Sequence, residues 1–324
     1  MKRLKILNLK TVGALIIAVC VLLLALKPEV YVKSSLTGIK LWALTVAPSL
    51  LPFFFLTALS SSIGITDKLA KATEKLTVKL FRCGGICSYA FLMSVLSGYP
   101  VGAKIISDLK TNGLISQDEA TRASSFCSTS GPLFIIGSVG IGMFGDKRAG
   151  YAIFLSHILS AVICGLIFRF YGDGDVSKTA RRSLINGGNV LYDAVYSSVI
   201  SVAMVGGFIC AFYIFADMLI SLKILLPLER VLFAVFKDEN ISKGFTAGLI
   251  ECTRGCKALS EYGVSRLSVA LASSTVSFGG VSVIFQSLAF LNIAKVKTGV
   301  FIISKILQTV ISFVLCLALF DLFF

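Results

Sequence analysis

The stretch SGYPVGAKIISD, residues 97–108, is the strongest indication of how this chain folds. It follows the apolar run 89–96 and places Gly98, Pro100 and Gly102 within a few residues, with Lys104 close behind. Glycine and proline interrupt helices, and a lysine is expensive inside a bilayer. The stretch therefore predicts a helix that breaks where it is buried, with a cation beside the break.

The composition of the chain indicates its class. The 324 residues are 56% hydrophobic and only 15% charged, whereas a soluble domain is about 25% charged. The mean hydropathy is +0.89. Because one soluble core cannot bury this much apolar surface, the sequence predicts an all-α polytopic membrane protein whose main partner is the lipid bilayer.

Charge and cysteine content argue against other classes. The formal net charge is +14, but the Lys and Arg residues lie mostly between apolar runs, as cytoplasmic anchors do. No basic stripe with interleaved aromatic residues is present, so nucleic acid is not an expected partner. The nine cysteines are odd in number and lie mostly inside apolar runs, which argues against a disulfide framework.

Apolar runs divide the chain into predicted membrane elements, at 11–26, 39–65, 86–103, 124–144, 149–171, 193–222, 244–256, 267–293 and 298–324. A spanning helix needs roughly 20 residues. The runs 86–103 and 244–256 are too short or too interrupted, so we interpret them as re-entrant hairpins buried in protein or lining a cavity. No small-x-small cleavage site follows the run 11–26, which we interpret as a retained first transmembrane helix.

The polar links between the runs fit this arrangement. Residues 66–82 alternate lysines with apolar residues and predict an amphipathic helix on the membrane surface. Residues 171–183 form one polar linker near the middle of the chain. With the N-terminus inside, fifteen Lys and Arg residues fall on predicted inner segments and nine on outer links, which favours a cytoplasmic N-terminus.

An internal repeat is indicated by two pairs of matching segments. SGYPVGAKIISDL (97–109) aligns with IECTRGCKALSEY (250–262), and SFCSTSGPLFIIG (125–137) aligns with SSTVSFGGVSVIF (273–285). Each unit crosses the membrane an odd number of times, which predicts inverted repeats with broken helices, as in secondary transporters. We divide the chain into an N-terminal transmembrane helix and first outer loop (1–38), a first repeat (39–171), a cytoplasmic linker (172–192) and a second, inverted repeat (193–324).

The broken segments carry the candidate binding residues. Helix N-termini at a hairpin tip favour anions, and the two hairpins add three cations, Lys104, Arg254 and Lys257, against one acid, Glu251. An alternative is that Lys104 and Lys257 anchor the hairpins or pair with Asp108 and Glu261, four residues on. The serines of 125–130 are expected to lie in a helix that Gly131 and Pro132 unwind after them. This hydroxyl-rich stretch, 125–132, and its counterpart 273–280 can bind a polar solute, or can hold helices together by close packing and hydrogen bonds. The full set is Ser97, Gly98, Tyr99, Gly102, Lys104, Ser128, Thr129, Ser130, Gly131, Glu251, Thr253, Arg254, Lys257, Ser277 and Gly279.

Other polar residues indicate no catalytic or metal chemistry. The pairs Cys83/Cys87 and Cys252/Cys256 have i, i+4 spacing, but no histidine or acidic cluster joins them, so we expect no bound metal. His157, the single histidine, lies in an apolar run and is expected to pack or to form interhelical hydrogen bonds. The chain has no phosphate loop, nucleophile elbow or zinc motif, so neither an enzyme nor a cofactor is expected.

The segment LSGYPVGAKIISDL, followed by ISQDEA and SFCSTSGPLFIIGSVGIGMFG, resembles the YlbJ-like sporulation integral membrane proteins, within the nucleoside-recognition (GATE) domain group. The resemblance runs from about residue 41 to the C-terminus and is most specific over 96–145; in the second half IECTRGCKAL matches best. It implies paired hairpins and broken helices in inverted repeats, as in concentrative nucleoside transporters and the membrane part of ferrous-iron transporters. The sporulation branch is implicated in moving dipicolinate, a small aromatic dicarboxylate, across the outer forespore membrane.

Pattern and resemblance together predict a multi-pass secondary transporter of a small organic anion, dipicolinate first. Lys104, Arg254 and Lys257 suit that charge, whereas no acidic or amide cluster near the hairpins points to a nucleoside. The alternatives are a nucleoside or metal-ion permease of the same fold group, and a non-transporting membrane scaffold for spore assembly. The sequence leaves open the coupling ion, the direction of transport and the association into homo-oligomers.

Overall fold

The structure, a computed structural model, describes residues 9–62, 65–173, 176 and 189–324. Every regular element within these ranges is a helix, which confirms the predicted all-α class. Four helices are long and apolar enough to cross a membrane, or up to six if each of two bent pairs counts as one span, among the residues described. The predicted linker 172–192 lies mostly outside the described residues.

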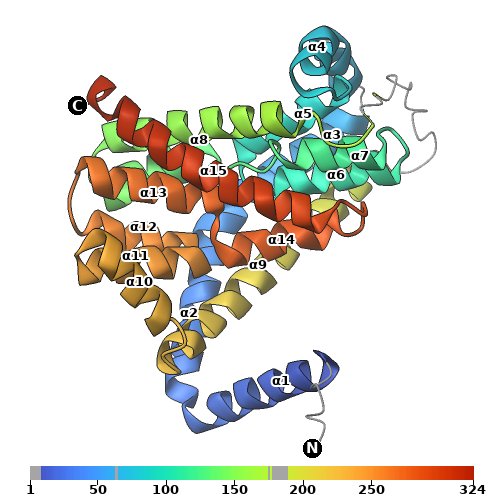
Figure 1. The fold of residues 1–324 in the computed structure, drawn as a ribbon. Coiled ribbons are helices and arrows are strands. Elements are labelled where there is room, and N and C mark those ends of the chain that lie inside the picture. The colour runs from blue at the N-terminus through green and yellow to red at the C-terminus, as the bar shows by residue number, and fades with distance from the viewer. Residues whose placement is uncertain (1–8, 63–64, 174–175, 177–188) are drawn as a thin grey trace, which may run out of the picture.

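The first half of the chain begins with α1 (Leu9–Leu26), which lies apart from the body of the protein (Figure 1). It bends by 102° into α2 (Pro28–Leu41), so the segment predicted as an outer loop is helical. Pro28 at the first helical positions explains the start of α2, because proline is favoured there. The chain continues through η1 (Trp42–Val46), α3 (Ala47–Ser62) and α4 (Ile65–Phe81).

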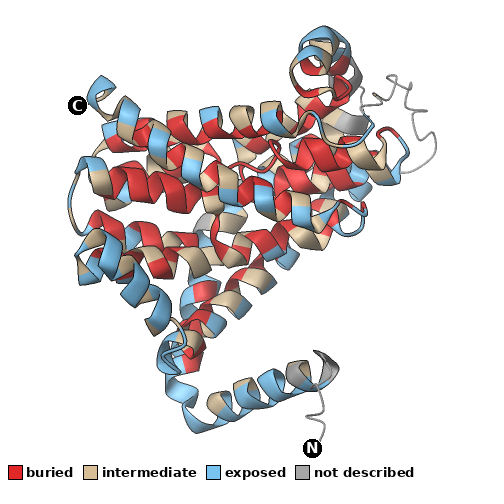
Figure 2. Cartoon of the chain, viewed as in Figure 1, coloured by how far each residue is buried: buried red, intermediate tan, exposed pale blue. Residues whose placement is uncertain are grey.

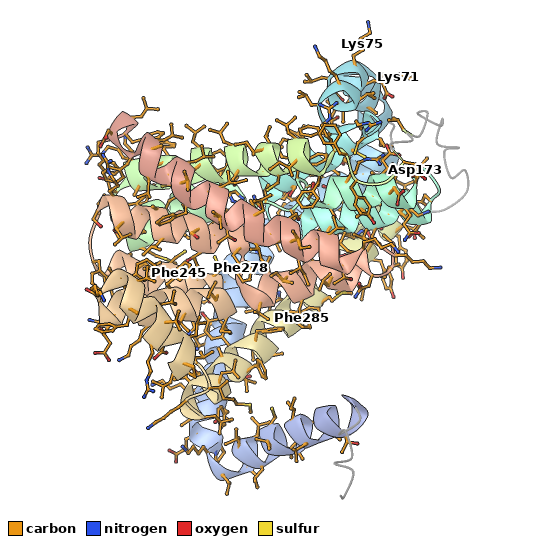
Figure 3. The ribbon with its side chains drawn as sticks, in the orientation of Figure 1. Lys71, Lys75, Asp173, Phe245, Phe278 and Phe285 are labelled. Carbon is orange, nitrogen blue, oxygen red and sulfur yellow. The ribbon has the colours of Figure 1, made fainter. Side chains whose placement is uncertain are left out.

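Helix α4 confirms the amphipathic helix predicted over 66–82. It projects from one edge of the body, and Lys71 and Lys75 point outward from it (Figures 1 and 3). Its buried side consists of small or apolar residues such as Ala70 and Phe81. A bend of 89° then leads into α5.

The predicted first hairpin is confirmed as α5 (Ile86–Ser97) and α6 (Val101–Thr111). Next come α7 (Gln117–Ser124), a non-helical stretch, the wide π-type helix η2 (Leu133–Met143) and α8 (Lys147–Phe168). We expected the serines of 125–130 to lie in a helix that unwinds after them, but they lie in the break itself. Pro132 starts the next helix instead of ending the previous one, because its missing N–H costs nothing at a helix N-terminus.

The second half repeats this order of elements. It runs through α9 (Val190–Ser221), α10 (Leu226–Phe236), the hairpin α11 (Glu239–Ile250) and α12 (Cys252–Ser260), the interrupted pair α13 (Arg266–Phe278) and α14 (Gly280–Leu291), and α15 (Thr298–Leu319) with a final turn η3 (Phe320–Leu322). Both α7 and α13 start with a capping box, at Ser116 and Ser265. The predicted second hairpin is therefore confirmed; the inversion of the two halves stays a prediction.

Burial is concentrated where the broken helices meet. Buried residues dominate the inner faces of α6, α8 and α13, whereas α1 is largely exposed (Figure 2). Residues 268–277 of α13 are all buried, although they include four hydroxyl side chains between residues 273 and 277. A helix buried on all sides with so many hydroxyl groups must satisfy them internally, and these contacts lie beside the breaks.

Candidate functional site

All four helix breaks line one pocket of about 140 Å³. Its wall includes Ser97, Gly98 and Tyr99 from the first hairpin, Ser130 and Gly131 from the first interrupted helix, Glu251, Cys252 and Thr253 from the second hairpin, and Gly279, Ser282 and Gln286 from the second interrupted helix. Leu41, Val46 and Leu50 add an apolar side. Pockets for drug-sized ligands measure roughly 300–1,000 Å³, so this one suits a small solute or is constricted in this state.

Within the first half, the two breaks touch through their backbones. Gly98 ends α5 with φ +89°, a left-handed conformation that glycine adopts without the penalty of a Cβ. A Cβ at Gly98 would lie 2.7 Å from the Gly131 nitrogen. Both the backbone conformation and this close contact therefore require glycine at position 98. The glycines of SGYPVG and STSGP therefore hold the hairpin tip against the unwound segment.

The second half repeats that contact. Gly279 and Gly280, where α13 gives way to α14, have φ values of +82° and +76°. A Cβ at Gly280 would lie 2.9 Å from the Ile250 oxygen and 3.1 Å from the Cys252 nitrogen, both at the tip of the second hairpin. In both halves, a hairpin tip thus rests on the break of the following helix.

His157 connects the two halves at the breaks. The Ser130 N–H donates to its Nε2 at 2.8 Å, and its Nδ1 lies 2.8 Å from the Ser277 hydroxyl. Because Nε2 accepts, the hydrogen of the neutral ring is on Nδ1, which donates to Ser277. The predicted role of His157 in interhelical hydrogen bonding is confirmed.

Lys305 of α15 lies directly behind the pocket wall. It is 1% exposed, and its Nζ donates to the Tyr99 hydroxyl at 2.7 Å, the Ser128 carbonyl at 3.1 Å and Gln308 Oε1 at 2.8 Å. The Tyr99 hydroxyl in turn donates to the Ser277 carbonyl at 3.3 Å. One cation therefore connects the first hairpin, the first unwound segment and the last helix.

Glu251 is the one charged residue among the described residues that line the pocket. Its carboxylate accepts the N–H groups of Thr253 at 3.1 Å and Arg254 at 2.8 Å, so it caps the N-terminus of α12. Gln286 lies on the same wall. Helix α14 thus places this amide on the wall that Glu251 of the second hairpin tip also lines.

The predicted cations lie outside this pocket. Lys104 pairs with Asp108 at 2.9 Å, as the alternative interpretation allowed. Lys257 is exposed and, within the described part of the chain, makes no ion pair with Glu261. Neither lysine lies beside the hairpin breaks, because each follows its break by a helical turn or more.

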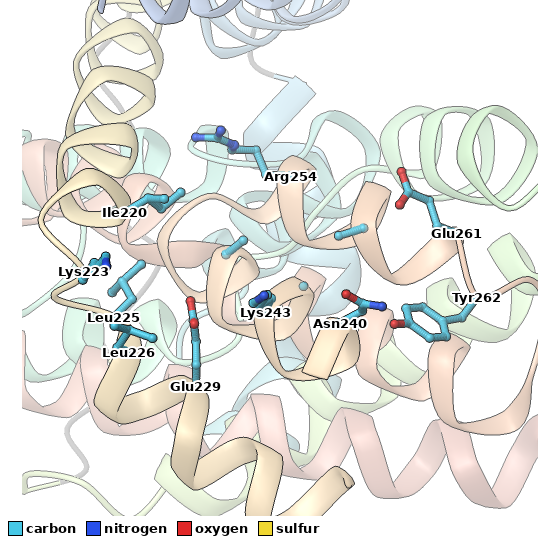
Figure 4. Close-up of a pocket in the computed structure, with 13 residues that line it drawn as sticks. Ile220, Lys223, Leu225, Leu226, Glu229, Asn240, Lys243, Arg254, Glu261 and Tyr262 are labelled. Carbon is cyan, nitrogen blue, oxygen red and sulfur yellow. The ribbon is translucent and has the colours of Figure 1, made fainter. Parts of the chain in front are cut away.

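Arg254 belongs to a second, larger pocket of about 880 Å³ between α10, α11 and α12 (Figure 4). Its guanidinium donates to Asp217 of α9 at 2.8 Å, and Ser34 of α2 donates to the same carboxylate. Thr253, one residue earlier, lines the smaller pocket. The first turn of α12 therefore lies between the two pockets.

The remaining predicted site residues support the breaks. The Thr129 hydroxyl bonds the Ser94 hydroxyl at 2.8 Å, and Ser128 offers its carbonyl to Lys305. Gly102 packs on the unwound segment, since a Cβ there would overlap the Cys127 carbonyl oxygen. No group of three or more His, Cys, Asp or Glu residues that could hold a metal occurs in the described ranges.

Sequence reasoning missed Lys305, Gln308 and Asp217. Each is a polar or charged residue inside an apolar run, and such residues mark functional sites in membrane proteins by default. That signal is present in the sequence, but the prediction relied on cations that lie close to the hairpin breaks along the chain.

Comparison with known proteins agrees with this geometry. Residues 43–147, which hold the first hairpin and the first interrupted helix, match the Gate family, described as nucleoside recognition. The apolar helices long enough to span a membrane and the pocket shared by the breaks define a multi-pass membrane protein that contains a Gate region.

A more specific relationship covers nearly the whole chain. It is 31% identical, over 333 aligned positions, to the sporulation integral membrane protein YlbJ of Bacillus subtilis (strain 168), covering 94% of this chain and 82% of that protein. The chain therefore belongs to the YlbJ family of sporulation integral membrane proteins, as its sequence motifs predicted. No solved structure matches it significantly.

Proposed function

We propose that this protein is a secondary transporter that moves a small organic solute through the pocket formed by the four breaks. The observation that carries the proposal is the convergence of both hairpins and both interrupted helices on one pocket. Backbone broken inside a membrane protein is tolerated where it lines a cavity, and transporters use such breaks to bind cargo. Movement of one half against the other would expose the pocket to either side in turn.

We propose a small organic anion as cargo, with dipicolinate as the first compound to test. The N-termini of α6, η2 and α14 begin at the pocket and have no side-chain cap, so their free N–H groups favour negative charge. The amino group of Lys305 lies behind Tyr99 and adds positive charge there when it is protonated. A cytoplasmic N-terminus, which the distribution of Lys and Arg favours, belongs to the same proposal. So does a location in the outer forespore membrane, which the family resemblance implies.

The test is uptake of labelled dipicolinate into proteoliposomes, with uridine and ferrous iron as comparison cargoes. We expect saturable dipicolinate uptake by the wild type. Ser138→Trp would fill the pocket and abolish uptake, because Ser138 lines it. Ile141→Trp on the same helix is the matched control, since Ile141 is 57% exposed and lies outside the pocket, and it should transport normally.

A nucleoside is the second candidate cargo. Glu251 and Gln286 on the pocket wall can hydrogen-bond a neutral polar solute, and the Gate region is described as nucleoside recognition. Saturable uridine uptake without dipicolinate uptake would select this candidate. Ferrous-iron uptake would identify a metal-ion permease, and no uptake of any cargo by folded protein would favour the scaffold.

A further inference from the structure

Lys305 is a buried cation without an acidic partner. Its three hydrogen-bond acceptors, from Tyr99, Ser128 and Gln308, are all neutral, and none of the ion pairs between described residues includes it. An ammonium group that is taken out of water and not paired is costly. Its position near Tyr99, with Nζ 4.7 Å from the ring centroid, offsets only part of that cost.

Buried hydrogen-bond donors without partners belong to two residues that contact Lys305 and to one residue of the adjacent pocket wall. Gln308 Nε2, the Ser128 hydroxyl and the Ser97 hydroxyl are buried and have no hydrogen-bond partner. Gln308 and Ser128 both accept from Lys305, and Ser97 lines the pocket. Since buried polar groups are nearly always paired, unpaired donors beside an unpaired cation indicate that an acceptor-rich group binds there.

Tyr99 separates Lys305 from the pocket. It lines the pocket, its hydroxyl accepts from Nζ at 2.7 Å, and it is 3.7 Å from the position of a Cβ at Gly279 on the opposite half. A rotation of this single side chain would join the cation to the cavity. The Tyr99 hydroxyl therefore occupies the position that an anionic oxygen of a solute would take.

We propose that Lys305, with Gln308, Ser128 and Ser97, forms a carboxylate-binding subsite behind Tyr99 that gives the pocket its preference for anions. This inference rests on the proposed transport function and deepens it. The solute's carboxylate displaces the Tyr99 hydroxyl from Nζ, and the neutral donors bind its remaining lone pairs. Neither Lys104 nor Lys257, which lie outside the pocket, takes part.

The test measures charge discrimination instead of uptake alone. Labelled dipicolinate uptake into proteoliposomes is competed by unlabelled pyridine-2,6-dicarboxylate and by its neutral isostere pyridine-2,6-dicarboxamide. In the wild type we expect the dicarboxylate to compete at least tenfold more strongly, a factor equivalent to about 1.4 kcal/mol. A change that only loosens the fold would weaken both competitors alike, so their ratio isolates the charge.

Two variants remove the proposed cation in different ways. Lys305→Gln removes the charge. Gln308→Glu places a carboxylate where the Gln308 oxygen lies, 2.8 Å from Nζ, so the lysine forms an internal ion pair and the side-chain volume is unchanged. Both should reduce the competition ratio to about one, while Lys305→Arg should retain a preference for the dicarboxylate. Lys297→Gln, the same change at the exposed start of α15, should behave as the wild type.

Each result decides between distinct statements. A wild type that transports dipicolinate, with the full ratio kept in Gln308→Glu or in folded Lys305→Gln, would overturn the subsite and leave the proposed function intact. If the diamide competes as strongly as the dicarboxylate in the wild type, the proposed subsite is refuted by the wild type alone. A wild type that takes up no dipicolinate refutes the proposed anion transport itself, whatever the variants do.

Discussion

Replacing His157 tests whether one side chain holds the breaks of both halves together. His157→Leu keeps the volume of the ring nearly constant but removes the acceptor of the Ser130 N–H and the donor to Ser277. His157 is completely buried, so water cannot replace either partner without rearrangement. The change therefore isolates two hydrogen bonds rather than a cavity.

The magnitude follows from these two contacts. A buried N–H left unpaired costs about 1–3 kcal/mol, and the net loss of the Ser277 hydrogen bond adds about 1 kcal/mol. We expect His157→Leu to lower the free energy of unfolding by about 2–4 kcal/mol. Ser160→Ala is the matched control on α8, because the Ser160 hydroxyl is buried but donates only to the His157 carbonyl of its own helix. It should cost less than about 1 kcal/mol.

The assay is reversible unfolding in mixed micelles by titration with dodecyl sulfate, followed by helical circular dichroism. The two variants and the wild type are compared at the same protein and detergent concentrations. The free energies of unfolding of His157→Leu and the wild type are then compared. A difference below about 0.5 kcal/mol is typical of surface substitutions and would refute the reasoning that His157 secures the breaks.

The remaining predictions concern the hairpins and their ion pairs. Gly102→Ala should yield no monodisperse protein in detergent, since its Cβ would overlap the Cys127 carbonyl, whereas Gly299→Ala, with no atom within 4 Å, should purify like the wild type; equal yields would contradict the close contact. Lys104→Gln should leave uptake unchanged and cost less than about 0.5 kcal/mol of stability, because it removes only a pair with Asp108 at i, i+4; a loss of uptake would return Lys104 to the site. A double-mutant cycle of Arg254→Gln and Asp217→Asn should give a coupling of about 1 kcal/mol, since the pair is partly buried and joins α12 to α9; strict additivity would show that the pair contributes nothing. Hydrogen bonds from the Ile241 N–H and other groups lower the pKa of Asp238 in the folded protein. The ionised carboxylate therefore stabilises the fold at pH values above its unfolded pKa near 4, and this contribution is lost as the pH falls through its folded pKa. The melting temperature of the wild type should therefore fall more than that of Asp238→Asn between pH 5 and pH 3. Equal falls in the two proteins would show that the Asp238 carboxylate does not stabilise the fold.

Local features of the sequence were sufficient to predict the class of the protein and the places where its helices break. Hydropathy and composition identified a multi-pass membrane protein, and Gly98, Pro100 and Gly279 marked interruptions that the structure contains. These are local properties, because a bilayer requires long apolar runs and a left-handed backbone requires glycine at the position itself. The role of His157 could be anticipated in kind, since a polar residue inside an apolar run must find a partner.

Which residues share the pocket depends on packing between helices that are distant in sequence, and local features could not predict it. Lys305 and Tyr99 are 206 residues apart, and no spacing rule relates a lysine in the last helix to a tyrosine in the first hairpin. Conversely, Lys104 lies close to the break in sequence but bonds along its own helix to Asp108. The sequence gives the position of a charged residue along its helix, whereas packing against other helices determines which neighbours its side chain contacts. The assignment of cations near the breaks by proximity in sequence therefore failed, and the buried cation was found where distant helices meet.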